Sequence, residues 1–253
     1  ALLESLSLPT LSSTENVLAH GFQGLSWSPD SKYLVTLYSL ETGTTLPKYN
    51  NPNPAGTHMT NQLYVWDLAS NQVVAKSASN LVTNIAWSPD GKYLATWTVG
   101  EAVGQNSSLQ LWNPVTWQVA KTYAHVADFS WSPDGSQMAL IKGGSVQILA
   151  AASDNVLRTF AGGHGAISAV TWQPHGTSLL VATYNVSANT FYLSLWNADT
   201  GSEVFPFTQY QGASASWSSD GTYVLMTAFN YHGQMPPSTP THVAWYEVIW
   251  IAK

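Results

Sequence analysis

The stretch "WSPDG" occurs twice in the chain, at Trp87–Gly91 and at Trp131–Gly135. Three variants of it complete the set: "WSPDS" from Trp27, "WQPHG" from Trp172 and "WSSDG" from Trp217. Successive tryptophans are 60, 44, 41 and 45 residues apart. Recurrence at such distances indicates a repeat protein, in which each repeat is one supersecondary unit that stacks on its neighbours.

A second phrase follows the tryptophan in every repeat. It reads "QLYVWDLAS" at 62–70, "LQLWNPVTW" at 109–117, "VQILAAASD" at 146–154, "LSLWNADTG" at 193–201 and "HVAWYEV" at 242–248. Two phrases that stay in register through five repeats indicate internal duplication and not coincidence.

Each repeat is predicted to form four β-strands, as the second repeat illustrates. Its "LVTNIAWS" (81–88) is apolar and β-branched, which is typical of a buried strand. Pro-Asp-Gly is a turn, because proline presets φ and glycine accepts a positive φ. The segments 92–98, 108–113 and 117–124 give three further strands, and no segment has a helical period with caps. The fold class is therefore all-β.

A four-stranded unit cannot bury both faces alone, whereas sheets stacked around an axis bury them and shield their edges. The "WSPDG" phrases, "VWD" at 65–67 and "LWN" at 111–113 and 195–197 resemble the WD-repeat β-propeller family, and "WSPDG" resembles its bacterial members. This resemblance covers about residues 12–248. It implies a five-bladed β-propeller of four-stranded antiparallel blades.

One domain is expected over residues 1–253, with repeat units at 21–79, 80–124, 125–164, 165–210 and 211–253. The last unit lacks a fourth strand, and residues 13–20 match the fourth-strand position of 118–125. In the family the two termini usually share one blade. We therefore expect residues 13–20 to complete the last blade, so that pairing of the N- and C-terminal strands closes the ring.

The composition excludes several classes of function. Charged residues make up 9% of the chain and its net charge is −6, so no basic patch for nucleic acid or an anionic membrane is expected. The chain has no cysteine, which removes thiolate catalysis and thiolate metal sites. No apolar run approaches the ~20 residues of a membrane span. These features leave the compartment open between the cytoplasm and an extracytoplasmic part of a larger chain.

The loops between the second and third strands differ widely in length, whereas the "SPDG" turns are nearly identical. Insertions concentrated on one face of a repeat protein often mark a binding surface. The long loops carry tyrosine, histidine, proline and asparagine, which suit a peptide or a carbohydrate. The predicted binding residues are Tyr38, Tyr49, His58, Trp97, Tyr184, Tyr231 and His232, each of which has blade packing as its alternative role.

No catalytic, metal or cofactor site is predicted. Only one acid lies within an inner strand, Asp128, so the converging carboxylates of a glycosidase are missing. Asn84, Asp128 and Ser214 are expected to line the central channel. The repeated tryptophans are expected to be structural, namely Trp27, Trp87, Trp131, Trp172 and Trp217. The family resemblance implies a structural role for His164 of "GGHG" (162–165), hydrogen-bonded across its own blade, although the family's partnering Asp is absent.

The expected function is a non-catalytic, monomeric platform that binds a protein or peptide through the face formed by the enlarged loops. One alternative is a five-bladed propeller that binds or cleaves carbohydrate. Another is a sensor module cut from a larger chain with a kinase or NTPase domain, as the resemblance to bacterial WD-repeat proteins suggests.

Overall fold

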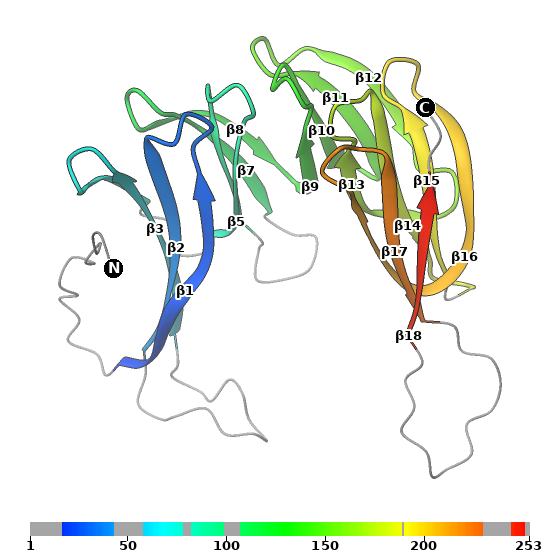
Figure 1. The fold of residues 1–253 in the computed structure, drawn as a ribbon, viewed down its shortest axis with the longest axis horizontal. Helices are drawn as coiled ribbons and strands as arrows, with labels where there is room; N and C mark the ends of the chain where they lie inside the picture. The colour runs from blue at the N-terminus through cyan, green and yellow to red at the C-terminus, as the bar shows by residue number, and fades with distance from the viewer. Residues whose placement is uncertain are drawn as a thin grey trace. The chain divides into compact units, whose positions relative to one another are not determined.

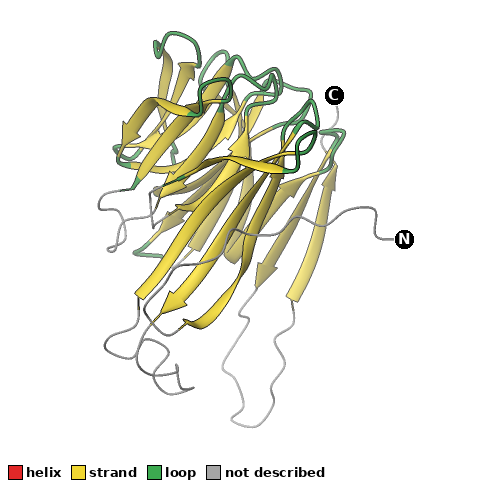
Figure 2. Cartoon of the chain, turned by 90° about the vertical axis from the view of Figure 1, so that its left-hand side faces the viewer, coloured by secondary structure: helices red, strands yellow, loops and turns green. Residues whose placement is uncertain are grey.

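The computed structural model describes residues 17–42, 58–77, 82–98, 107–188, 190–229 and 244–250. Within these ranges every regular element is a β-strand, as Figure 2 shows by colour. Residues 1–124 and 125–253 form two compact units. The division falls at the predicted boundary between the second and third repeats. The all-β prediction is confirmed.

Residues 1–124 contain two four-stranded antiparallel sheets, each with its strands in chain order (Figure 1). Blade one consists of β1 (Val17–Trp27), β2 (Tyr33–Thr42), β3 (His58–Asp67) and β4 (Gln72–Lys76). Blade two consists of β5 (Val82–Trp87), β6 (Leu94–Thr98), β7 (Ser108–Asn113) and β8 (Gln118–Ala124). The four strands per repeat are those that the sequence predicts.

Residues 125–253 contain one four-stranded and one six-stranded sheet. Blade three consists of β9 (Val126–Trp131), β10 (Gln137–Lys142), β11 (Ser145–Ala150) and β12 (Val156–Ala161). The six-stranded sheet consists of β13 (Ala166–Trp172), β14 (Ser178–Asn185), β15 (Thr190–Asn197), β16 (Ser202–Trp217), β17 (Tyr223–Phe229) and β18 (Ala244–Trp250). Blade four is β13–β16, and blade five is the end of β16 with β17 and β18.

Blades four and five share β16. Its first part pairs with β15, and from Gln211 onward it pairs with β17. The predicted repeat boundary at 210/211 therefore falls inside one continuous strand. The chain stays extended because a shift in register between Gln211 and Ala213 accommodates the intervening residue without a turn.

The residues expected to close the ring have a different partner where the structure describes them. Val17 lies opposite Thr42 and His20 lies opposite Leu40, so 17–20 extend β1 and pair with β2. No turn separates these residues from the rest of the inner strand. Among the described strands, β18 pairs with β17 alone. Closure by the termini stays a prediction.

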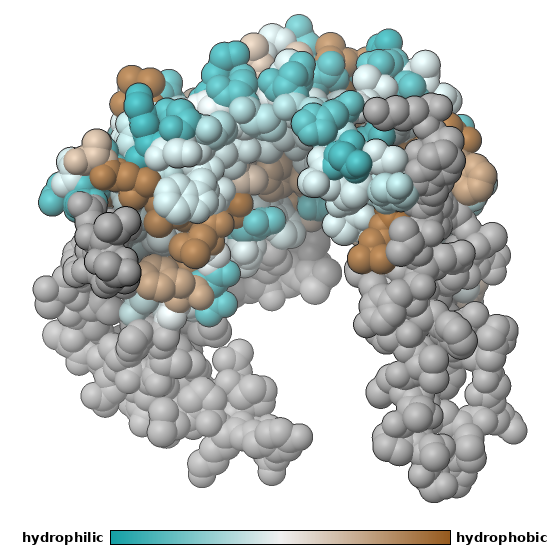
Figure 3. Space-filling model, viewed as in Figure 1, coloured by the Kyte–Doolittle hydropathy of each residue, from teal (hydrophilic) through white to brown (hydrophobic). Residues whose placement is uncertain are grey.

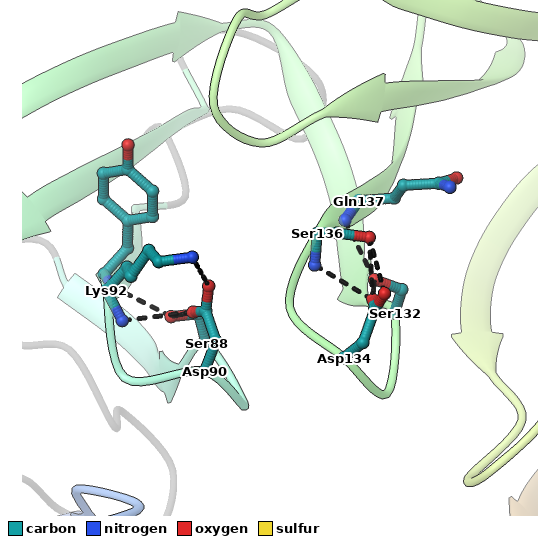
Figure 4. A network of polar contacts seen from close by, with 8 residues as sticks. Ser88, Asp90, Lys92, Ser132, Asp134, Ser136 and Gln137 are labelled. Carbon is teal, nitrogen blue, oxygen red and sulfur yellow. Dashed lines mark hydrogen bonds and ion pairs between the residues drawn. The ribbon is translucent and has the colours of Figure 1, made fainter.

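The repeated turn is held by a small hydrogen-bond network that Figure 4 shows in two repeats. The Ser88 hydroxyl donates to Asp90 Oδ1 at 2.7 Å, and Tyr93 N donates to Ser88 Oγ at 2.9 Å. Ser132 donates to Asp134 in the same way, also at 2.7 Å. This bond, together with the Ser136 N–H, holds the pKa of Asp134 below its usual value. The aspartates of this phrase therefore stabilise a turn.

In three repeats the tryptophan of the phrase packs onto the blade that precedes its own. Trp87 lies in one cluster with Val35, Leu63 and Val65 of blade one. Trp172 clusters with Ile141 and the other aliphatic residues of blade three, and Trp217 packs on the leucines of blade four. Burial between sheets, which stabilises by roughly 25 cal/mol per Å² of apolar area, accounts for the repetition of this residue.

A β-bulge interrupts the outermost strand of blades one to four at the same place. In blade one, Val73 of the fourth strand lies opposite Trp66 of the third strand, and the residue after Val73 has no opposite residue. Blades two, three and four each have one such residue at the equivalent position. The unpaired residues are Val74, Ala120, Leu157 and Val204. A bulge twists the edge strand and disfavours pairing with another chain.

Candidate binding surface

The two ends of the blades differ in the lengths of their connections. First and second strands are joined by short turns of similar length at one end. At the other end, which we name the variable end, second and third strands are joined by 15, 9, 2, 4 and 14 residues (43–57, 99–107, 143–144, 186–189 and 230–243). Consecutive connections of an antiparallel sheet alternate between its ends, so these loops all lie opposite the turns.

Four of the seven predicted binding residues have side chains outside the described part of the chain. Tyr49, Tyr231 and His232 lie in segments that the structure does not describe, and His58 is described only as the first residue of β3. Tyr38 is described, and it is only 4% exposed. Its ring lies edge-on to Phe22, with 5.5 Å between the ring centroids. Tyr38 therefore packs within blade one and does not present a surface to a partner.

Trp97 also lies on a packing face. It is opposite Leu109 of β7 and shares its side of blade two with Ala95 and Leu111. These three neighbours are fully buried, whereas Trp97 is half-buried. The corresponding face of blade one is the one that covers the next blade. This register favours packing, the alternative role that the sequence leaves open for Trp97.

Tyr184 is the predicted residue that the structure places at the variable end with part of its ring exposed. Its ring lies 4.6 Å from that of Phe191, tilted by 38°. Between them the loop carries Val186, which is 74% exposed. An Asx turn, in which Ala188 N donates to Asn185 Oδ1 at 3.0 Å, shapes this loop. We name Tyr184, Val186 and Phe191 the blade-four rim.

The predicted channel residues all lie on inner strands. Asp128 Oδ2 accepts a hydrogen bond from Val170 N at 2.9 Å, so β9 is joined to β13. Asn84 Oδ1 accepts from its neighbour Ile85 N at 2.8 Å. Ser214 is described only as a residue of β16 opposite Thr227. Asp128 thus fastens blade three to blade four, a role that the sequence did not predict.

A second side chain of β9 also accepts a hydrogen bond from β13. Ser130 Oγ accepts from Trp172 N at 2.9 Å, two residues along both strands. The first strands of blades three and four, β9 and β13, do not pair with each other, so these backbone N–H groups need side-chain acceptors. Burial raises the pKa of Asp128, although hydrogen bonds from the N–H groups of Val170 and Phe129 oppose this effect.

Replacing Asp128 tests this role. Asp128→Ala leaves the N–H of buried Val170 unpaired and is expected to lower the free energy of unfolding by about 1–3 kcal/mol. Asp128→Asn retains an acceptor and removes the charge. Because the folded-state pKa is raised, the wild type loses stability as the pH rises from below 3.8 through that pKa. Urea unfolding at several pH values should show that the free energy of unfolding of Asp128→Asn rises relative to that of the wild type from acid to neutral pH. A difference between the two proteins that is constant with pH contradicts this.

His164 packs across blade four as the family resemblance implies, but with a partner that the sequence did not reveal. Its Nε2 lies 3.0 Å from Glu203 Oε1, and its ring stacks on Tyr192 at 5.1 Å. Glu203 occupies the fourth-strand position that holds Val73 in blade one and Val156 in blade three. An acid at a position otherwise held by valine is the signal that could have identified it.

In the described ranges, no three histidine or acidic side chains gather closely enough to hold a metal ion. No helix long and apolar enough to cross a membrane occurs among the residues that the structure describes.

Two family models match parts of the chain. The model "WD domain, G-beta repeat" matches residues 70–113, and the model "Eukaryotic translation initiation factor eIF2A" matches residues 113–235. No curated protein sequence matches the chain.

Solved structures match almost the whole chain at low identity. Kuenenia stuttgartiensis hydrazine synthase is 14% identical over 96% of this chain and 66% of its own, with a TM-score of 0.64. The structure of U3-55K is 15% identical over 84% of this chain and 61% of its own, with a TM-score of 0.52. The RRP9 WD40 repeats are 15% identical over 85% and 61%, with a TM-score of 0.51. The chain spans less than two thirds of each, and such identities show the fold alone.

Proposed function

We propose that this chain, a WD-repeat β-propeller of four-stranded blades, is a non-catalytic scaffold that binds a protein or peptide at the variable end. The observation that carries the proposal is the contrast between uniform turns at one end of the blades and connections of 2 to 15 residues at the other. A repeat protein needs its turns constant for stability, and it varies the loops that contact a partner.

The described chemistry of the variable end supports a polypeptide partner. The blade-four rim presents two aromatic rings and an exposed valine without a charged group. Aromatic side chains of this kind anchor protein interfaces, because they bury a large area and lose little conformational entropy. A rigid base supports the rim: a Cβ on Gly165 would lie 2.5 Å from the Tyr184 carbonyl oxygen, so the two segments are in close backbone contact.

Affinity capture from the source organism tests the proposal. The intact chain is compared with a variant whose segments 42–59 and 231–239 are replaced by short glycine-containing turns. A partner held by the intact chain and lost by the variant supports the variable end, provided that the thermal midpoint is unchanged. Equal capture by both would exclude these two segments as the binding site. Glycan binding without protein capture would favour the carbohydrate alternative.

A matched pair of point variants sharpens the test. Val186→Asp adds a charge at the blade-four rim, and Val156→Asp adds one at the turn end of blade three, where the side chain is 54% exposed. We expect Val186→Asp to weaken binding of the captured partner by about tenfold, which corresponds to ~1.4 kcal/mol, and Val156→Asp to leave it unchanged. Titration calorimetry measures both, and equal affinities would reject the rim as a contact.

A further inference from the structure

One tryptophan of blade two has a backbone conformation that is unusual for its residue type. In blades one to four, the turn between the third and fourth strands ends in a residue with a positive φ. Blades one, three and four have Asn71, Asp154 and Gly201 there, the residue types that tolerate this conformation best. Blade two has Trp117, with a φ of +53°. A bulky residue retained in a strained conformation points to a function for its side chain.

The ring of Trp117 lies where blades one and two meet at the turn end. It is perpendicular to Tyr33 of blade one, with 5.0 Å between the ring centroids, and to Trp87 of its own blade at 6.1 Å. Trp117 and Tyr33 are half-buried, and Val115 of the same turn is 87% exposed. Figure 3 shows hydrophobic residues among hydrophilic ones on the described surface of this unit. We name Tyr33, Trp87, Val115 and Trp117 the blade-two corner.

The hydrogen bonding of Trp87 distinguishes this corner from an ordinary part of the core. Trp87 is 8% exposed, and its Nε1–H has no acceptor among the residues that the structure describes. The equivalent group of Trp172 donates to the Gly176 carbonyl oxygen at 3.0 Å. A buried donor without an acceptor costs about 1–3 kcal/mol. The corner therefore combines an unpaired N–H with the strain at Trp117, and a contact that only joined two blades would need neither.

We propose that the blade-two corner binds a neutral oligosaccharide, with Trp117 stacking on one of its sugar rings. The apolar C–H face of a sugar packs on an aromatic ring, and its hydroxyls need neutral hydrogen-bonding groups around that ring. Thr116 and Gln118, on either side of Trp117, are exposed and supply such groups. No residue of the turn is charged, and Lys32 beside the tyrosine of the corner already pairs with Asp30 at 3.9 Å. These surroundings suit a neutral ligand better than a charged one.

Oligosaccharide binding by the full chain tests the proposal. The chain is screened on an array of neutral oligosaccharides, and the best ligand is titrated by calorimetry. Trp117→Asn introduces the residue type that blade one has at this place, so the turn keeps its conformation. We expect this variant to weaken the affinity for the oligosaccharide by about tenfold or more. Asn71→Gly alters the equivalent turn of blade one and should leave the affinity unchanged.

An exposed variant keeps the test decisive if Trp117→Asn does not fold. Val115→Asp changes a side chain that packs on nothing in the interior, and the charge it adds should weaken the affinity by about threefold. The proposal is overturned if no oligosaccharide on the array binds, or if the variants of the corner bind as well as the intact chain. It is also overturned if Trp117→Asn loses a captured protein partner and no sugar binds. Val186→Asp alters only the variable end and should leave oligosaccharide binding unchanged, so this test is independent of the proposed function.

Discussion

Replacing Gly221 with alanine is expected to lower the free energy of unfolding by about 3 kcal/mol or more, which would be among the largest effects of any single methyl group in this chain. Gly221 has a φ of +68°, a conformation that costs alanine about 1–2 kcal/mol. A Cβ there would also lie 2.1 Å from the Pro174 carbonyl oxygen. The two turns are joined by Gln173, whose Nε2 donates to the Gly221 carbonyl oxygen at 2.8 Å. Relieving the clash would therefore separate the turns of blades four and five.

Gly91→Ala is the matched control for Gly221→Ala. Gly91 occupies the same place in its turn with a φ of +72°, but a Cβ there would meet nothing closer than Pro29 Cδ at 4.0 Å. Only the backbone strain remains, and we expect a loss of about 1 kcal/mol. Ser31 adopts a φ of +59° in the first repeat, which shows that the turn accepts a side chain. Urea unfolding measures both variants, and equal losses would disprove the contact between the turns of blades four and five.

Trp172→Ala is expected to lower the free energy of unfolding by about 3–5 kcal/mol, the usual cost of removing a buried tryptophan. Trp172 is 7% exposed, packs on blade three, and donates from Nε1 to the Gly176 carbonyl oxygen at 3.0 Å. Trp27→Ala removes the residue at the same position of the first repeat, which is 58% exposed. We expect it to cost less than about 1 kcal/mol.

Thermal and urea unfolding of both tryptophan variants distinguish two views of the repeated phrase. If the tryptophan acts within its own blade, the two losses will be similar. If it acts by packing on the preceding blade, only Trp172→Ala will be severe. A large loss from Trp27→Ala would show that a further segment covers that side chain.

The binding residues were harder to predict than the strands. Tyr38, Trp97 and Tyr184 all lie in second strands, so the sequence does not distinguish them. Tyr38 proved to be buried and Trp97 shares a packing face, whereas Tyr184 lies beside an exposed loop residue. Trp97 and Tyr184 fall on the same side of their sheets, so their position along the strand and their neighbours decide these outcomes.

Contacts between residues far apart in the chain were also beyond the sequence. The acceptor for Val170 N is Asp128, 42 residues earlier, and the partner of His164 is Glu203, 39 residues later. Neither pair forms a local motif. In contrast, the turn after the tryptophan is held by a bond between residues only two apart, and its Pro-Asp-Gly sequence predicted it.

The sequence by itself determined the all-β class, the four strands of most repeats and the turn after each tryptophan. These features depend on alternation, turn chemistry and the proline and glycine preferences of the backbone, all of which act over a few residues. Only the tertiary structure decided the continuous β16, the bulges of the outer strands and which aromatic side chains are buried. These features depend on which surfaces meet when sheets stack, and the side chains that meet there are dozens of residues apart in the chain.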